Sequence, residues 1–147
     1  MDKYVFTLTL WVSHPDADLS AVPAKLGLAY KYLWNKGAPR KTRKGRALPG
    51  FYEHSRCAFE LDVSQETSLP TGLRTAIGIL NTHRTYLAEL SGGGVKISLF
   101  AGIYADEQNA RDILGWEILR DLAELRISLD FDFYGLDQAE SESQDSN

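Results

Sequence analysis

Two carboxylates near the end of the chain, Asp130 and Asp132, have the spacing of an acid–base pair. They lie in the stretch ISLDFDFY, where apolar and polar residues alternate, so a strand would place both on one face. At a rise of ~3.4 Å per residue their separation is about 7 Å, which is in the range that paired carboxylates use in sugar hydrolysis. Because any polar strand face gives this spacing, the pair supports a small hydrolase-type enzyme only as an alternative.

Three other side chains suit acid–base or nucleophilic chemistry. His83 falls beside the apolar stripe of a predicted helix, where a histidine is usually a boundary residue and less often a general base. His54 and Cys57 are three residues apart, but a Cys–His pair also needs spatial contact, an orienting group and an oxyanion site. Cys57 has the inward phase of its strand, where cysteine behaves as a small hydrophobic residue. We therefore assign no catalytic residue and do not favour an enzyme.

Neither a metal nor a cofactor is predicted. His14, Asp16 and Asp18 are close in sequence, but they lack a further well-spaced ligand, and capping of the following helix explains Asp18. The glycine run at residues 92–94 follows a predicted helix, whereas phosphate-binding glycine loops precede one. No nucleotide-binding motif is present elsewhere in the sequence.

A basic segment is the strongest charge feature, with six cations in the eleven residues that end at position 46. They are Lys36, Arg40, Lys41, Arg43, Lys44 and Arg46. Glycines and prolines interrupt the segment, which predicts a long loop over residues 35–50. Such a loop suits the phosphates of a nucleic acid, or it is solvated, or it pairs with the acidic C-terminal end. The rest of the chain holds all twenty acids and would repel a polyanion, so nucleic acid is not the favoured partner.

The elements that would position these side chains follow from hydrophobic periodicity. Strands are predicted over residues 4–12, 29–34, 56–63, 95–104 and 127–134, and helices over 19–28, 70–90 and 107–125. The order indicates an α+β fold with a mostly antiparallel sheet and helices on one face. It begins as a ferredoxin-like split βαβ pattern (β-α-β-β-α-β) and is extended by a further α-β unit, whose place in the sheet the sequence does not give. Residues 1–136 form one domain, and the acidic tail 137–147 is predicted to be disordered.

The strand alternation also predicts which side chains leave the helix-covered side of the sheet. Phe131 and Phe133 take the inward phase of the last strand. The candidate binding residues on the outward phase are Trp11, Phe100, Tyr104, Asp130, Asp132 and Tyr134. Aromatic residues among acids suit a protein partner bearing Lys or Arg, a sugar-like ligand or self-association, whereas base stacking would need positive charge beside them. The alternative is a face that the basic loop or the last helix covers.

Several short motifs occur together in the chain. They are Leu26-Gly27-Leu28 after a short helix, Trp34-x-Lys36-Gly37 before the basic loop, His83-Arg84 in a helix, and Leu129-Asp130-Phe131-Asp132-x-Tyr134 at the end. With this pattern, residues 4–135 resemble a bacterial family known only as a domain of unknown function. The resemblance implies an α+β domain and supplies no activity. Its relatives include small proteins near toxin or phage-defence loci, which by analogy implies an immunity-like role.

Taken together, these features predict a non-enzymatic binding or interaction module, whose partner is a protein or a second copy of the chain. The alternatives are a small hydrolase that uses the carboxylate pair and a phosphate or nucleic-acid binder that uses the basic loop. The N-terminus is not a signal peptide, and no apolar run approaches the ~20 residues of a membrane span. With one cysteine in 147 residues, a reducing bacterial cytoplasm is the expected location, without membrane association.

Overall fold

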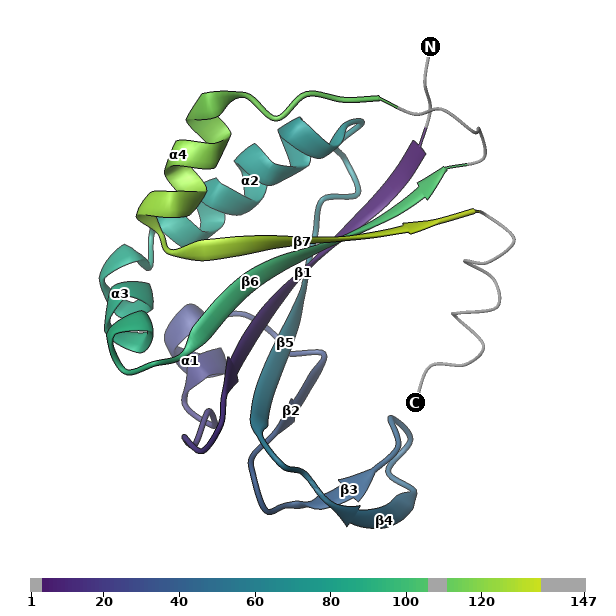
Figure 1. Cartoon of the computed structure of the whole chain (residues 1–147), viewed down its shortest axis with the longest axis vertical. Coiled ribbons are helices and arrows are strands. Elements are labelled where there is room, and N and C mark those ends of the chain that lie inside the picture. Colours follow the sequence, from purple (N-terminus) through teal and green to yellow (C-terminus); the bar gives the residue numbers. More distant parts are fainter. Residues whose placement is uncertain (1–3, 106–110, 136–147) are drawn as a thin grey trace.

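A five-stranded sheet forms the centre of the molecule (Figure 1). The computed structural model describes residues 4–105 and 111–135. The strand order is β2-β5-β1-β6-β7, with bounds β1 Tyr4–His14, β2 Tyr32–Trp34, β5 Ser55–Leu61, β6 Lys96–Ala105 and β7 Ile127–Tyr134. Neighbours are antiparallel except β6 and β7, which are parallel. β5 therefore separates the parallel strands β1 and β2, and β7 extends the sheet beyond β6.

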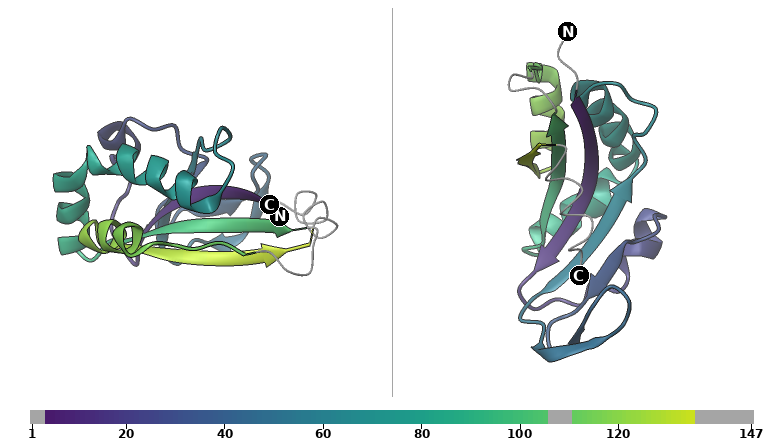
Figure 2. Two further views of the ribbon diagram at one scale, coloured as in Figure 1. Left: turned by 90° about the horizontal axis from the view of Figure 1, so that it is seen from above. Right: turned by 90° about the vertical axis from the view of Figure 1, so that its right-hand side faces the viewer.

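The helices of the described ranges cover one face of this sheet (Figure 2). Their bounds are α1 Val22–Leu26, α2 Leu69–Asn81, α3 Arg84–Gly92 and α4 Trp116–Glu124. The inward phase of β1, β5 and β6 packs with the apolar sides of the helices into one core. Its fully buried members include Leu10, Phe59, Leu73, Leu87 and Leu99. The predicted α+β fold with a mostly antiparallel sheet is confirmed.

The predicted single helix over 70–90 is wrong, because the chain breaks between α2 and α3. The Thr82 hydroxyl donates to the Ile79 carbonyl, and His83 leaves the helical region at φ −112° and ψ 24°. The apolar spacing of seven residues continues across the break, from Leu73 and Leu80 in α2 to Leu87 in α3. That periodicity fits two helices on the same core as well as one, so it could not reveal the interruption.

The helix boundaries have local causes. The Ser68 side chain accepts a hydrogen bond from the Thr71 amide and caps α2. Gly27, at φ 66°, ends α1 in the left-handed conformation that favours glycine. The predicted N-cap Asp18 is wrong, since α1 begins after Ala21 and has no side-chain cap. Asp18 instead accepts bonds from the Ser20 amide and the Asn35 side chain.

The predicted loop over 35–50 contains a hairpin, formed by β3 Pro39–Lys41 and β4 Ala47–Phe51 as a separate two-stranded sheet. Its turn is closed by a bond from the Thr42 amide to the Arg46 carbonyl, with Gly45 at φ 86°. Most of its side chains are exposed, so the strands carry no apolar alternation that would have predicted them. The hairpin extends from the β2–β5 end of the sheet, on the side away from the helices (Figure 1).

Other elements also differ from the prediction. The strand expected over 29–34 is limited to β2, and residues 111–115 of the helix expected over 107–125 are not helical. Residues 106–110 and the tail predicted to be disordered lie outside the described residues. Phe131 and Phe133 take the helix side, as predicted, but stay exposed, because α4 lies beside the beginning of β7 (Figure 1) and both rings line a groove farther along the strand. None of the helices in the described ranges has the length and hydropathy to cross a membrane.

Candidate binding site on the open sheet face

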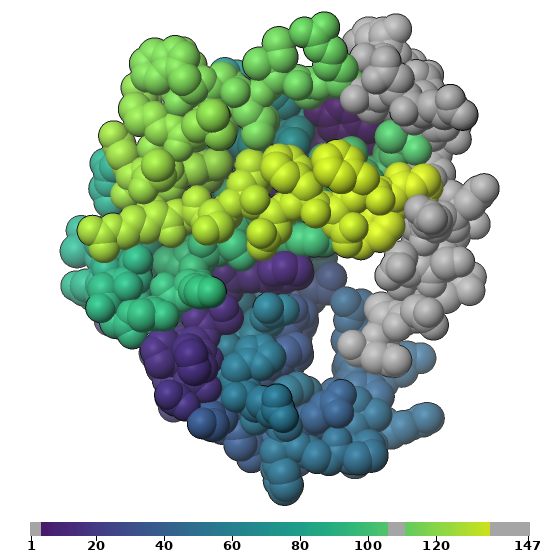
Figure 3. Space-filling view, in the orientation of Figure 1, coloured from purple at the N-terminus to yellow at the C-terminus, as the bar shows by residue number. Residues whose placement is uncertain are grey.

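The helix-free side of the sheet, here called the open face, carries every second residue of its strands. The strand register arranges them in rows that cross the sheet. From the hairpin end, these rows are Trp34–Arg56–Ser13–Lys96, Tyr32–Ala58–Trp11–Ser98–Ser128, Glu60–Thr9–Phe100–Asp130, Thr7–Gly102–Asp132 and Val5–Tyr104–Tyr134. All six residues of the predicted outward face therefore share this side. The space-filling view shows the molecule hollowed between β7 and the β3–β4 hairpin (Figure 3).

A sandwich of three side chains occupies the middle of the open face. Phe100 stacks on Trp11 with ring centroids 4.5 Å apart, and the Arg56 guanidinium lies 4.8 Å from the centre of the Trp11 ring. Because β6 and β5 flank β1 on opposite sides, the two neighbours cover opposite faces of the indole. Ala58 points to the same face and is fully buried between Trp11 and Tyr32. The indole therefore has no free face on which a nucleic-acid base could stack.

The acidic side chains lie farther from the hairpin. Asp130 is exposed beside Phe100, and Asp132 is half-buried in the next row. The Tyr134 hydroxyl donates to Asp132, while its ring stacks on Tyr104 with centroids 5.2 Å apart. Asp130 and Asp132 thus share a face as predicted, but Asp132 is bonded to the Tyr134 hydroxyl.

Positive charge gathers at the hairpin end of the open face. Arg56, Lys96 and Arg126 line one cavity of about 420 Å³, with Asp130 on its edge. The aromatic residues were expected to lie among acids, and at this end of the face cations lie beside Trp11 instead. The cations come from β5, β6 and the residue before β7, so no sequence window contains them together. Only the strand register, with Ser13 opposite both Arg56 and Lys96, brings them near one another.

The predicted basic residues lie at this same end, on the hairpin and its base. Lys36 forms an ion pair with Asp16 at 2.8 Å, and this hydrogen bond lowers the pKa of the Asp16 carboxyl. The Arg40 guanidinium donates to the Pro49 carbonyl within the hairpin. At the hairpin base, Trp34 stacks on Tyr52 with centroids 4.4 Å apart. The acidic C-terminal end, predicted as a partner for these cations, lies outside the described residues.

The remaining catalytic candidates are not brought together. His83 lies at the start of α3 on the helix side of the sheet, away from the carboxylate pair. Cys57 is fully buried, and burial raises the pKa of its thiol to about 12. His54 places its ring edge-on to Trp34. A thiol that stays protonated in the core is a poor nucleophile.

The residues considered for a metal site are used otherwise. The His14 Nδ1 accepts bonds from the amides of Asp16 and Ala17, at 2.9 and 2.8 Å. Asp16 forms the ion pair with Lys36, and Asp18 accepts a hydrogen bond from the Ser20 amide in the turn before α1. Within residues 4–105 and 111–135, no three His, Cys, Asp or Glu side chains are grouped as metal ligands would be.

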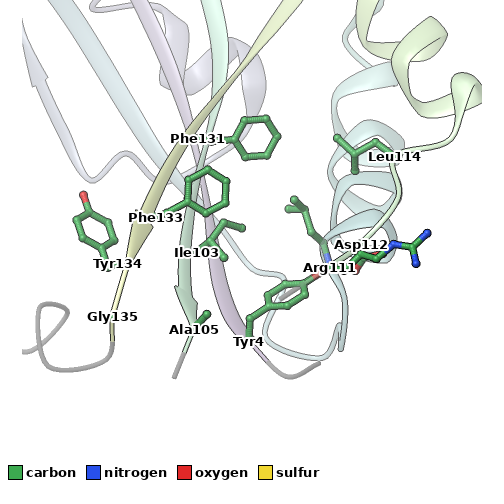
Figure 4. Close-up of a pocket in the computed structure, with 11 residues that line it drawn as sticks. Tyr4, Ile103, Ala105, Arg111, Asp112, Leu114, Phe131, Phe133, Tyr134 and Gly135 are labelled. Atoms are coloured by element: carbon green, nitrogen blue, oxygen red, sulfur yellow. Dashed lines mark hydrogen bonds between the residues drawn. The ribbon is translucent and has the colours of Figure 1, made fainter. Parts of the chain in front are cut away.

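A second cavity, of about 720 Å³, lies on the helix side near the end of β7 (Figure 4). Phe131 and Phe133 line it, and they are 43% and 70% exposed. At its floor the Tyr4 hydroxyl donates to Asp112 and accepts from the Leu69 amide at 2.7 Å. Burial, followed by the bond to Asp112, raises the pKa of Tyr4 to about 12. This apolar groove was missed because both phenylalanines have the phase of core residues.

Comparisons with known proteins identify a family and leave the activity open. A family model described as "Domain of unknown function (DUF4279)" matches residues 3–136, which is most of the chain. No curated protein and no solved structure matches it.

Proposed function

The chain belongs to the DUF4279 family of domains of unknown function, and we propose that it is a non-enzymatic binding module that recognises a protein partner across its open face. The observation that carries this proposal is the Arg56–Trp11–Phe100 sandwich at the centre of a sheet face without helices. Tryptophan, tyrosine and arginine are the residues that dominate binding energy at protein interfaces. Here Trp11 and Arg56 are two of these types, and with Phe100 they stand on paired strands, so they are ordered before a partner binds.

The charges beside the sandwich specify the kind of partner. Glu60 and Asp130 lie in the row of Phe100, and Asp132 lies in the next row. A partner segment with Lys or Arg opposite these acids would complement them and gain in association rate and specificity. An immunity-like role, in which the domain blocks a basic toxin or nuclease in the cytoplasm, is the concrete version of this proposal.

Two features argue against the alternatives. The Tyr134 hydroxyl is bonded to Asp132, and His83 lies on the other side of the sheet, which argues against a hydrolase built on the carboxylate pair. Base stacking on the central indole is blocked because Arg56 and Phe100 cover its two faces. A protein partner needs only the outer edges of these side chains, which are half-buried in the free domain.

The test combines capture with a measured affinity. A photo-crosslinking amino acid at position 100 would attach the partner in the cell of origin, and mass spectrometry would identify it. The purified partner is then titrated against the wild-type protein and the variants Phe100→Ser and Asp130→Lys. We expect each change to weaken binding by at least about tenfold, because an interface centre loses an anchor or gains a like charge.

Leu119→Ser is the matched control, because Leu119 is 50% exposed on α4, on the other side of the sheet. It should leave the affinity unchanged. An affinity that Phe100→Ser and Asp130→Lys leave at the wild-type value, in proteins that still unfold cooperatively, would refute the proposed interface.

A further inference from the structure

The cavity at the hairpin end of the open face differs from the rest of that face in its lining. Its volume of about 420 Å³ is within the range of small-molecule sites. Besides the aromatic wall of Trp11, it is lined by four serines, Ser13, Ser91, Ser98 and Ser128. A hydroxyl both donates and accepts, so these groups can bond the oxygens of a polar ligand in either direction.

The charges of the lining are not balanced by the protein. Arg56, Lys96 and Arg126 face one carboxylate, Asp130, which leaves the cavity with two positive charges in excess. None of the three cations forms an ion pair with a carboxylate in the described part of the chain. The Nε of Arg56 is also buried without an acceptor among these residues. A buried donor without a partner costs free energy, so the protein itself does not saturate the hydrogen bonds of this guanidinium.

Arg126 gives an independent indication. It follows Leu125, the C-cap residue of α4, and has φ 58°, the one positive value among the described non-glycine residues. Glycine is the residue that this position after a helix favours, because it has no Cβ to clash in the left-handed conformation. An arginine in its place carries strain, and strain of this kind concentrates at functional sites. Its side chain lines the cavity.

We propose that this cavity binds a small organic phosphomonoester. The phosphate carries a charge of about −1.5 to −2 at neutral pH, which matches the two excess positive charges. Arginine and lysine would bond its oxygens, the serine hydroxyls would complete the contacts, and Asp130 would accept a bond from a hydroxyl of the organic part. The inference goes beyond the proposed function, since it needs no protein partner.

Calorimetric titration of the full-length protein with ribose 5-phosphate, at pH 8 and low salt, tests the inference. We expect a dissociation constant of about 1 mM or tighter. Lys96→Gln and Arg126→Gly should each weaken binding by at least about tenfold, because each removes a charge-assisted hydrogen bond. Arg126→Gly should also keep or raise the unfolding temperature, since glycine relieves the strained position. Loss of binding in a protein that is no less stable separates a ligand role from a structural one.

Arg43→Gln is the matched control, because Arg43 is a hairpin cation that does not line the cavity. It should bind like the wild type, and so should Leu119→Ser, because Leu119 lies on α4 on the other side of the sheet. The titration contains no protein partner, so its failure is distinct from a failure of the proposed protein interface. Three results would overturn the inference. They are no binding of ribose 5-phosphate, equal loss in Arg43→Gln, and binding of the dicarboxylate succinate in preference to the phosphate. A short single-stranded oligonucleotide could also bind more tightly than ribose 5-phosphate and lose affinity in Arg43→Gln. That result would assign the phosphate site to the hairpin and would overturn the inference as well.

Discussion

Gly72 of α2 lies so close to Phe6 of β1 that an added Cβ would be 2.6 Å from the Cε2 atom of the ring. The contact leaves no room for a side chain at this position between α2 and the central strand. Gly72→Ala should therefore lower the free energy of unfolding by about 1–2 kcal/mol, because displacing the ring costs more than the gain in helix propensity. Chemical denaturation of the two proteins measures the difference.

Gly78 is the control for this substitution, since it lies in the same helix with nothing within 4 Å of an added Cβ. Gly78→Ala should raise the free energy of unfolding by up to about 1 kcal/mol, because alanine is the better helix former. Equal effects at the two positions would show that the contact with Phe6 does not limit the packing.

The sheet could be predicted from the sequence because its strands bury one face. Leu8, Leu10 and Leu99 alternate with polar or half-buried residues, and the structure keeps that phase. The hairpin could not be predicted in this way, since neither of its faces is buried. The parallel pairing of β7 with β6 depends on how α4 crosses the sheet, and no local pattern encodes that crossing.

The candidate site was partly predictable for the same reason. Trp11, Phe100 and Asp130 were assigned to one face by alternation alone. The basic cavity was not, because its cations are separated by tens of residues and none belongs to a motif. The positive φ of Arg126 could not be predicted either, because glycine is the residue that marks such a position in a sequence.

The hydroxyl of Tyr4 joins the start of α2 to the segment before α4, through Leu69 and Asp112. Tyr4→Phe should lower the free energy of unfolding by about 1–2 kcal/mol, because both bonds are lost. The pKa of Tyr4 is raised from 10.0 to about 12 in the folded protein, so the neutral form is the one that folding favours. The contribution of the Tyr4 hydroxyl to the free energy of unfolding is thus complete below pH 10 and is lost as the pH rises towards 12.

The measurement is the difference in unfolding free energy between wild type and Tyr4→Phe across this pH range. Other groups that titrate above pH 10 affect both proteins and cancel in the difference. A difference in unfolding free energy that stays constant from pH 9 to about 12 would contradict the assigned cause of the raised pKa.

Cys57 should be inert in the folded protein. Its thiol is fully buried with a pKa of about 12, so almost no thiolate is present at pH 8. A disulfide reagent should label it only as fast as the domain opens, and at the rate of a free cysteine in denaturant. Rapid labelling of the folded protein would reopen the nucleophile hypothesis for this residue.

The stack of Trp11 on Phe100 should be measurable without any partner. The single variants Trp11→Leu and Phe100→Leu and the double variant form a cycle whose coupling reports the ring contact alone. We expect a coupling of about 0.5–1.5 kcal/mol, the value typical of stacked aromatic pairs. Trp11→Leu should lower the free energy of unfolding more than Phe100→Leu does, because it also removes the ring over which the Arg56 guanidinium lies. A coupling near zero would mean that the rings are held by the strands and not by each other, and that Phe100 is free to move when a partner binds.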